Sequence, residues 1–269
     1  MQIKAGYRLG YECSQPTPML LCLNIHPSRR HDLLTPQTLV YSPAVEAWDY
    51  TDGFDNVCTR ITAPVGRLTI STEFEIHDSG LRDVVPLDAT QHDIRDLPDE
   101  TLVYLLGSRY CETDKLSQIA WSLFAHTQPG WPRVQAILDY VHNHIRFDYM
   151  RADRTRTAFG GYTERVGVCR DYTHLAIAFF RAMNIPARYC TGYLGDIGNV
   201  PVPGPMDFSA WAEVYLGGHW YTADARNNVP RIGRILMAIG RDATDVALST
   251  EFGPAVLAEF FVIAEEVAS

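Results

Sequence analysis

One cysteine stands where a helix is predicted to begin. Cys169 follows the turn 166–168, which contains a glycine, and opens a long helical pattern of apolar residues. A thiol in the first turn of a helix faces unpaired backbone N–H groups and the positive end of the helix dipole, and both favour the thiolate. Because the thiolate is the form that attacks carbonyl carbons, we predict that Cys169 is the nucleophile of an acyl-transfer site.

A predicted β-hairpin downstream supplies a second candidate, Asp224. Gly217 and Gly218 lie between two apolar runs and indicate a two-residue type I′ turn, because glycine readily adopts the positive φ angles of this turn. Counting outward from the turn pairs 213 with 222 and places Ser209, Trp211 and Asp224 on one face of the hairpin. A cysteine, then a strand, then a strand-borne aspartate is the order of a Cys-His-Asp triad, and Ser209 holds the position of the histidine.

The histidines of the second half of the chain are poor substitutes for this base. His219 lies on the opposite face of the hairpin, roughly 17 Å of strand away from Asp224. His174 lies about 140° around the helix from Cys169 and so points away from the thiol. A histidine from the first hundred residues stays open as the base, and the candidates are His26, His31, His77 and His92.

The composition excludes several classes of protein. The chain has 269 residues and a formal net charge of −9, which argues against binding to nucleic acid. No apolar stretch approaches the roughly 20 residues that span a bilayer, and the first residues lack the apolar core of a signal peptide. We therefore expect a cytoplasmic protein with neither a nucleic-acid partner nor a membrane partner.

The cysteine and histidine spacings do not indicate a metal site. Six cysteines are scattered along the chain without a C-x-x-C pair, so we expect most of them to be small buried side chains. His142 and His144 are two residues apart on a predicted helix and do not share a face for a metal. Since the chain also lacks a glycine-rich phosphate loop and the HExxH motif, we expect no metal and no cofactor.

The apolar pattern changes near residue 100. Residues 1–100 contain short alternating runs separated by proline, glycine and aspartate, as in an antiparallel sheet or sandwich. Helical stripes follow at 116–124 and 134–145, and further strands are expected at 187–194, 208–216, 219–224 and 256–263. The chain is thus predicted to be α+β, with a β-rich module at 1–100 and a second module at 101–269.

Several segments together resemble a known family. The motif Gly-Val-Cys-Arg-Asp-Tyr at 167–172 and the runs 182–188, 210–215 and 220–224 are similar to those of bacterial transglutaminase-like proteins, which are often classed as cysteine proteases. Segments 15–20 and 26–29 resemble the β-rich region that precedes the core in many of these proteins, and 231–242 resembles the tail of one subgroup. The resemblance covers nearly the whole chain.

This resemblance implies a papain-like, transglutaminase-like core, in which a helix bearing the cysteine packs on an antiparallel sheet. It implies that Cys169 is the nucleophile, that Asp224 orients the base and that Ser209 replaces the usual histidine. The implied reaction is acyl transfer from, or hydrolysis of, an amide in a peptide or protein substrate through a thioester, without metal or cofactor.

Three functional hypotheses remain open. A histidine from residues 1–100 completes the site, or Cys169 and Asp224 support a slow or altered transferase or hydrolase, or the protein is an inactive pseudoenzyme that binds peptide or protein through the retained cleft. Resemblance to arylamine N-acetyltransferases is a further alternative, but no segment indicates a coenzyme A site. Trp211, Tyr172 and Phe208 are candidates for lining the cleft, with ordinary core packing as the alternative.

Overall fold

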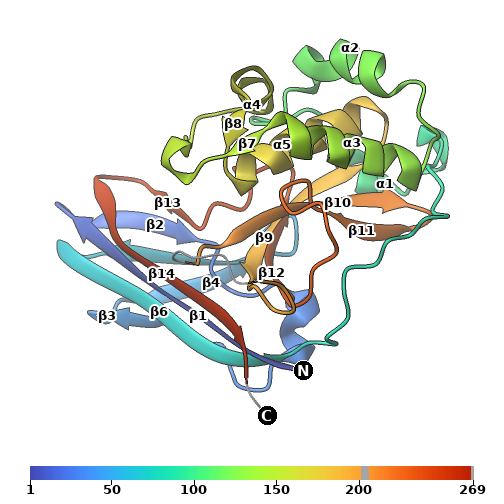
Figure 1. The fold of residues 1–269 in the computed structure, drawn as a ribbon. Coiled ribbons are helices and arrows are strands. Elements are labelled where there is room, and N and C mark those ends of the chain that lie inside the picture. The colour runs from blue at the N-terminus through green and yellow to red at the C-terminus, as the bar shows by residue number, and fades with distance from the viewer. Residues whose placement is uncertain (201–205, 268–269) are drawn as a thin grey trace.

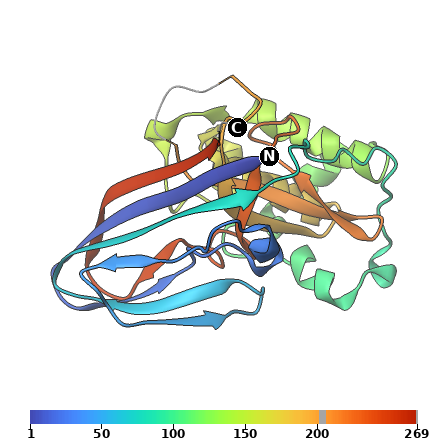
Figure 2. The ribbon, with the colours of Figure 1, turned by 90° about the horizontal axis from the view of Figure 1, so that it is seen from below.

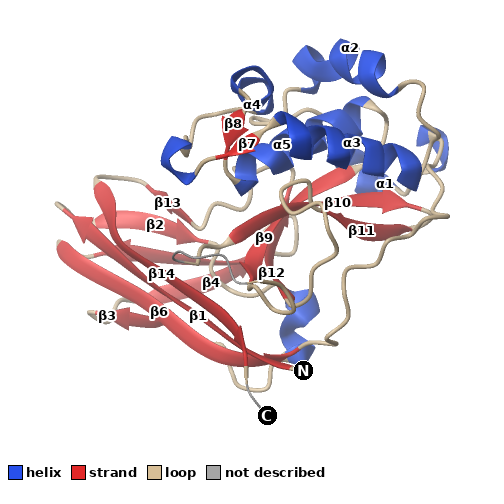
Figure 3. Ribbon diagram, in the orientation of Figure 1, coloured by secondary structure: helices blue, strands red, loops and turns tan. Residues whose placement is uncertain are grey.

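The helices gather on one side of a central sheet, and the remaining strands extend away from its other side (Figure 1). The computed structural model describes residues 1–200 and 206–267. Figure 3 separates the helices from the strands by colour. The α-helices are α1 (Asp99–Leu102), α2 (Thr113–Phe124), α3 (Trp131–His144), α4 (Ala158–Glu164) and α5 (Cys169–Ala182), and the 3₁₀ turns are η1 (Pro27–Asp32), η2 (Ile94–Asp96), η3 (Val103–Leu105) and η4 (Tyr149–Arg151).

The central sheet has four antiparallel strands in an order that differs from their order in the sequence. The order across the sheet is β11 (His219–Ala223), β10 (Ser209–Leu216), β9 (Ala187–Leu194) and β12 (Arg234–Gly240). A short parallel pair, β7 (Arg146–Phe147) and β8 (Val166–Gly167), lies just before α5. These strands confirm the α+β class that the sequence predicts.

The helices begin and end where the sequence signals favour it. Pro132 lies in the first turn of α3, where a missing N–H costs no hydrogen bond. Helix α5 ends at Ala182, and two residues later Asn184 has a φ of 61°, the left-handed conformation that asparagine tolerates better than most residues. Among the described helices, none combines the length and the apolar character needed to cross a bilayer.

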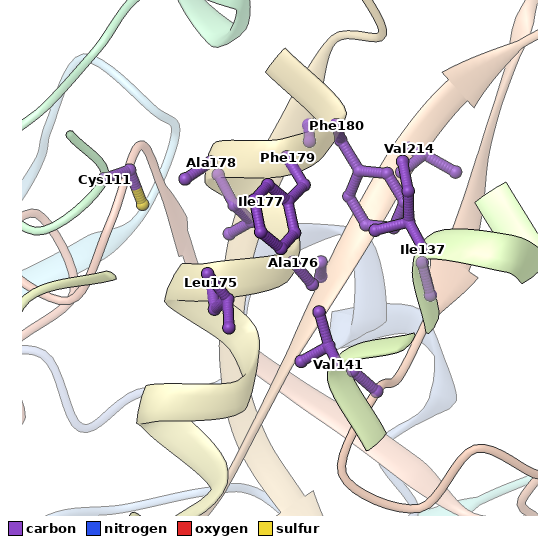
Figure 4. Close-up of a cluster of buried hydrophobic side chains, with 14 of the residues drawn as sticks. Cys111, Ile137, Val141, Leu175, Ala176, Ile177, Ala178, Phe179, Phe180 and Val214 are labelled. Carbon is purple, nitrogen blue, oxygen red and sulfur yellow. The ribbon is translucent and has the colours of Figure 1, made fainter. Parts of the chain in front are cut away.

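Helix α5 is the most buried helix and anchors the helical layer to the central sheet. Its apolar residues 175–180 pack against Ile137 and Val141 of α3 and against Val214 of β10 (Figure 4). All of these side chains are fully shielded from solvent. Burial on both sides fixes the first residue of α5 relative to the first residue of β10.

The hairpin of β10 and β11 has the register that the sequence predicts. Glu213 pairs with Thr222 and Leu216 with His219. The two turn glycines, 217 and 218, have φ angles of 55° and 88°, as a type I′ turn requires.

Two further sheets, which we call the outer sheets, contain strands from both ends of the chain. One has the order β14 (Ala255–Glu266), β1 (Gln2–Cys13), β6 (Gly66–His77) and β3 (Val40–Ser42). Its three long strands lie side by side in Figure 2, with β14 in red, β1 in dark blue and β6 in cyan. The other has the order β13 (Ser249–Glu251), β2 (Thr17–Leu21), β5 (Val57–Ala63) and β4 (Ala47–Thr51).

The last two strands, β13 and β14, belong to the outer sheets, which the sequence analysis did not predict. The predicted division assigned all residues of 101–269 to the second module, whereas β13 and β14 pair with β2 and β1 of the first. The predicted strand at 256–263 is present as part of β14, but it extends the outer sheet and not the central one. Strand pairing between the two ends of the chain leaves no signal in local periodicity, which explains the difference.

The register of β14 can be tested with two neighbouring substitutions. Val262 is 2% exposed and lies opposite Tyr7, whereas Phe261 is 55% exposed. We predict that Val262→Asp lowers the free energy of unfolding by about 3 kcal/mol or more, because it buries an unpaired carboxylate. The control Phe261→Asp should change it by less than about 1 kcal/mol in urea denaturation. Equal effects of the two substitutions would contradict this register.

Candidate active site at the start of helix α5

The turn before Cys169 is held by the side chain of Asp171. The backbone N–H of Val168 donates to Asp171 Oδ2 at 2.8 Å, and Arg156 Nη1 donates to the same oxygen at 3.3 Å. A side chain at Gly167 would collide with the Asp171 carboxylate, which explains why glycine suits this position. These contacts cap the first turn of α5 and fix the direction of the thiol.

The sulfur of Cys169 lies beside the backbone of β10. The backbone N–H groups of Ala210 and Arg170 hydrogen-bond the sulfur and lower its pKa, as expected at a helix start. Burial has the larger effect, however, and together with the negative charges of Asp207 and Asp224 it raises the pKa of the Cys169 thiol to about 11. The predicted preference for the thiolate is therefore outweighed by desolvation and by two carboxylates.

Ser209 opens strand β10, one residue before the N–H that contacts the thiol. It pairs with Gly192 of β9, and its carbonyl accepts a hydrogen bond from Thr191 Oγ1 at 3.3 Å. The register of the hairpin places Ser209 on the side of the sheet that carries Trp211, as predicted. The structure thus brings the serine position and Cys169 to the same end of the central sheet.

Asp224 is buried directly after β11 and has three donors. Arg234 Nη2 forms an ion pair with Asp224 Oδ2 at 2.7 Å, and Asn227 donates from its backbone N at 3.0 Å and from its side-chain Nδ2 at 2.8 Å. Burial alone would raise the pKa of Asp224, but the guanidinium and the two Asn227 donors reverse this and hold the pKa below its usual value. Asp224 is therefore an ionised carboxylate that already has a cation.

Arg234 is a site residue that the sequence analysis did not identify. Its guanidinium lies 5.0 Å from the centroid of the Trp211 ring and also forms an ion pair with Asp83 at 3.0 Å. Arg234 thus pairs with the aspartate that would orient the histidine in a triad. Only the pairing of β12 with β9 brings this residue to the site, so no local pattern could have identified it.

A second unpredicted pair, Asp207 and Tyr149, lies near the thiol. Tyr149 Oη donates to Asp207 Oδ2 at 2.6 Å. Tyr149 follows β7, and the N–H of Asp148 donates to the carbonyl of Gly167 at 3.0 Å, which brings η4 next to the turn before Cys169. Burial raises the pKa of Asp207, partly offset by the hydrogen bond from Tyr149. Asp207 precedes the hairpin in an irregular segment, where periodicity gives no information.

The histidines of residues 1–100 have contacts away from the thiol. His26 Nδ1 bonds Ser28 Oγ at 2.9 Å, His31 lies beside Asp32, and His92 stacks on Tyr215. His77 is the last residue of β6, where it pairs with Gln2. The structure therefore gives no support to the hypothesis of a histidine supplied by the N-terminal strands.

The histidines of the second half also have partners of their own. His174 stacks on the ring of Tyr110, and burial lowers its pKa to about 3. His142 bonds the carbonyl of Ala225, and His144 bonds that of Tyr162. Among the described residues, no group of three or more histidine, cysteine or acidic side chains is arranged to hold a metal ion.

The three candidate cleft residues lie in the interior. Trp211, Tyr172 and Phe208 are each at most 6% exposed. Tyr172 Oη donates to the carbonyl of Ile145 at 2.5 Å, and Phe208 packs against the ring of Tyr7. In this conformation they support the site from within, and their contact with a substrate stays a prediction.

A small cavity lies beside Asp224, on the side of α3. Its volume is about 40 Å³, and its lining includes Asp83, Trp131, Gln135 and Thr222. A space of this size holds a few water molecules and is far smaller than a ligand pocket of several hundred Å³.

We compared the chain with models of protein families and with solved structures. Residues 118–225, which include α3, α5 and the hairpin, match the model of the transglutaminase-like superfamily. The whole chain superposes on a candidate cysteine protease from Cytophaga hutchinsonii with a TM-score of 0.86, at 28% sequence identity and covering 91% of that chain. Residues 118–225 thus form a transglutaminase-like core, and the chain has the papain-like α+β fold that its motifs predict.

A relative from Mycobacterium leprae is similar over a shorter stretch. This uncharacterized protein is 38% identical over 84 residues, which are 30% of the present chain and 30% of its own. The match thus spans about a third of the relative's length.

The pKa of Cys169 can be measured by alkylation. We predict that the rate of iodoacetamide labelling, followed by peptide mass spectrometry, rises with pH to a midpoint near 11, because burial disfavours the thiolate. Asp207→Asn should move the midpoint to lower pH, since it removes a negative charge beside the sulfur. A wild-type midpoint below about 8.5, the value of an unperturbed thiol, would contradict this environment.

The ion pair of Asp224 can be tested by its contribution to stability. We predict that Arg234→Met lowers the free energy of unfolding by about 3–5 kcal/mol, because it leaves a buried carboxylate without its cation. The double variant Arg234→Met/Asp224→Asn should recover part of this loss. Because the pKa of Asp224 is depressed, its contribution in the wild type is present at neutral pH and is lost as pH falls below about 4. Additive effects of the two substitutions would exclude the pair as a source of stability.

Proposed function

We propose that this chain is a slow, cysteine-dependent acyl transferase or amide hydrolase of peptides or proteins, which forms a thioester at Cys169. The observation that carries the proposal is the position of the thiol, at the start of α5 and beside the N–H of Ala210. The family match and the similarity to a candidate cysteine protease support the same chemistry. With neutral pH far below the pKa of the thiol, only a small fraction of it is ionised, so turnover without a base is slow.

In this proposal Asp207 takes the place of the missing base. It is the carboxyl with the largest electrostatic effect on Cys169, and it is not engaged by an arginine as Asp224 is. Burial raises the pKa of Asp207, which makes its carboxylate a better proton acceptor than an exposed aspartate. Tyr149 orients the carboxyl through its hydrogen bond of 2.6 Å.

The proposed reaction balances with these two groups and water. The sulfur of Cys169 attacks the amide carbon, the C–S bond forms, and the thiol proton passes to the Asp207 carboxylate. When the C–N bond breaks, the leaving amine takes this proton and the thioester remains. Water or an acceptor amine then attacks the thioester carbon and gives up a proton to the Asp207 carboxylate. The C–S bond breaks, the acid or the new amide is released, and the proton passes from Asp207 to the sulfur.

Two acyl donors distinguish a proton-carrying role of Asp207 from a purely electrostatic one. A p-nitrophenyl ester has a leaving group that needs no proton, whereas a peptide p-nitroanilide has an amine leaving group that does. We predict that Asp207→Asn reduces turnover of the anilide by about 10²–10⁴-fold, while acylation of Cys169 by the ester, which needs Asp207 only to take the thiol proton, falls by a smaller factor. The result is read from p-nitroaniline release and from the mass of the peptide containing Cys169.

Two controls accompany this test. Tyr149→Phe keeps the carboxyl but removes the hydrogen bond that lowers its pKa, so the acidic limb of the pH–rate profile should move to higher pH. Cys169→Ser should abolish acylation at this position. If Asp207→Asn changes the ester and anilide rates by the same factor, Asp207 does not deliver the proton to the leaving amine.

A second candidate function is binding of peptide or protein without turnover. The ion pair between Asp224 and Arg234 favours it, because this aspartate is not free to orient a histidine. Ser209→His distinguishes the candidates, since a restored base should raise anilide turnover by at least about tenfold in an enzyme limited by that base. Absence of acylation in both the wild type and this variant would favour the binding protein.

A further inference from the structure

Two cysteines on neighbouring strands of one outer sheet lie directly opposite each other. Cys58 is in β5, and Cys22 follows the last residue of β2. The antiparallel register pairs Leu21 with Thr59, so the next pair in the same register is Cys22 with Cys58. The spacing of the cysteines along the sequence gives no sign of this pairing.

Backbone hydrogen bonds identify which type of pair this is. The N–H of Cys22 donates to the carbonyl of Leu248, on the side of β13, at 3.0 Å. Because the N–H and C=O of a strand residue point to the same side, Cys22 does not direct them toward β5. Cys22 and Cys58 therefore form a non-hydrogen-bonded pair, in which α-carbons lie about 4.5 Å apart and side chains are closest. A disulfide accepts α-carbon separations of about 4.4–6.8 Å.

The two sulfurs interact in the reduced protein. Both are free thiols, 4% and 8% exposed for Cys22 and Cys58 respectively. A hydrogen bond between them lowers the pKa of Cys58 and raises that of Cys22, so Cys58 is the sulfur that ionises first. Cys58 Sγ also donates to Asp52 Oδ2 at 3.9 Å, and this contact and the charge of Asp52 oppose part of the lowering of the pKa of Cys58.

Cys58 has a neighbour at the surface on its other side. Tyr50 of β4 pairs with Cys58 and is exposed. Tyr50, Asp49, Asp55 and Val57 line an open hollow of about 620 Å³. Cys58 is thus the cross-strand neighbour of a residue that lines this hollow.

We propose that Cys22 and Cys58 are a redox site that forms a reversible disulfide when the protein meets a peroxide. The Cys58 thiolate attacks hydrogen peroxide to give a sulfenic acid and hydroxide, and the hydroxide takes the proton of the Cys22 thiol. The Cys22 sulfur then displaces the second oxygen as hydroxide, which is protonated to water by the proton that Cys58 released. In sum two thiols lose two protons and two electrons, and peroxide becomes two molecules of water. In a reducing compartment the pair stays a dithiol.

The disulfide would link two neighbouring strands of one outer sheet, beside a contact between that sheet and the central sheet. Asn56, two residues before Cys58, exchanges two buried hydrogen bonds with the backbone of Ile239 in β12, at 2.7 and 2.8 Å. A disulfide between Cys22 and Cys58 ties β2 to β5 next to this contact and restricts the unfolded chain between the two residues. We expect the oxidised protein to melt about 5–10 °C higher than the reduced protein.

The test uses the full chain treated with hydrogen peroxide. After alkylation of the remaining thiols and digestion without reductant, mass spectrometry should find the peptides of Cys22 and Cys58 joined. The free-thiol count in denaturant should fall from six by two, and dithiothreitol should restore it. Cys190→Ala, which alters a buried cysteine of the central sheet, is the matched control and should leave the cross-link and the rise in melting temperature intact.

Three outcomes would overturn the proposal. The first is a folded wild-type protein in which all six thiols survive the oxidant. The second is oxidation of Cys58 to the sulfinic acid without a cross-link. The third is a rise in melting temperature that persists in Cys58→Ala or Cys22→Ala. Because the cross-link is detected in the wild type, instability of either variant does not affect the main result.

Discussion

The ion pair between Asp224 and Arg234 determines what the candidate site can do. In a Cys-His-Asp triad the aspartate orients the histidine and stabilises its positive charge. Here Asp224 is paired instead with a permanent cation, Arg234, and arginine does not accept a proton at neutral pH. A buried Asp224 without any cation would be costly, so Arg234 makes the absence of a histidine compatible with a stable fold.

The thiol shows that the position of a cysteine does not by itself decide its reactivity. Helix α5 starts at Cys169, and two backbone N–H groups reach its sulfur, as in an activated cysteine. Yet the surrounding protein removes water from the sulfur, and Asp207 and Asp224 add two negative charges nearby. In a triad a protonated histidine would offset these charges, and no such cation is recorded beside the sulfur in the described residues. Reactivity at neutral pH then depends on a group that accepts the proton of the Cys169 thiol, and we propose Asp207 for this role.

What the sequence could predict was governed by local pattern. The glycine pair, 217 and 218, gave the hairpin and its register, and the apolar stripe after Cys169 gave α5. Cys169, Ser209 and Asp224 could be related to one another because a helix start and a single hairpin contain them. Arg234, Asp207 and the pair of Cys22 with Cys58 could not, because strands distant in sequence or an irregular segment bring them into place. For the same reason the pairing of β14 with β1 was not predictable.

These distant pairings also connect the outer sheets to the site. Phe208 lies between Asp207 and Ser209, and its ring packs at 5.8 Å from that of Tyr7 in β1 and at 5.9 Å from that of Phe260 in β14. The segment that carries the proposed base is thus held by strands from both ends of the chain, in addition to the hydrogen bond from Tyr149 of η4. The distance between Cys169 and Asp207 then depends on how the outer sheets and the central sheet pack together. A change in that packing would alter the chemistry at Cys169 without touching α5 or the hairpin.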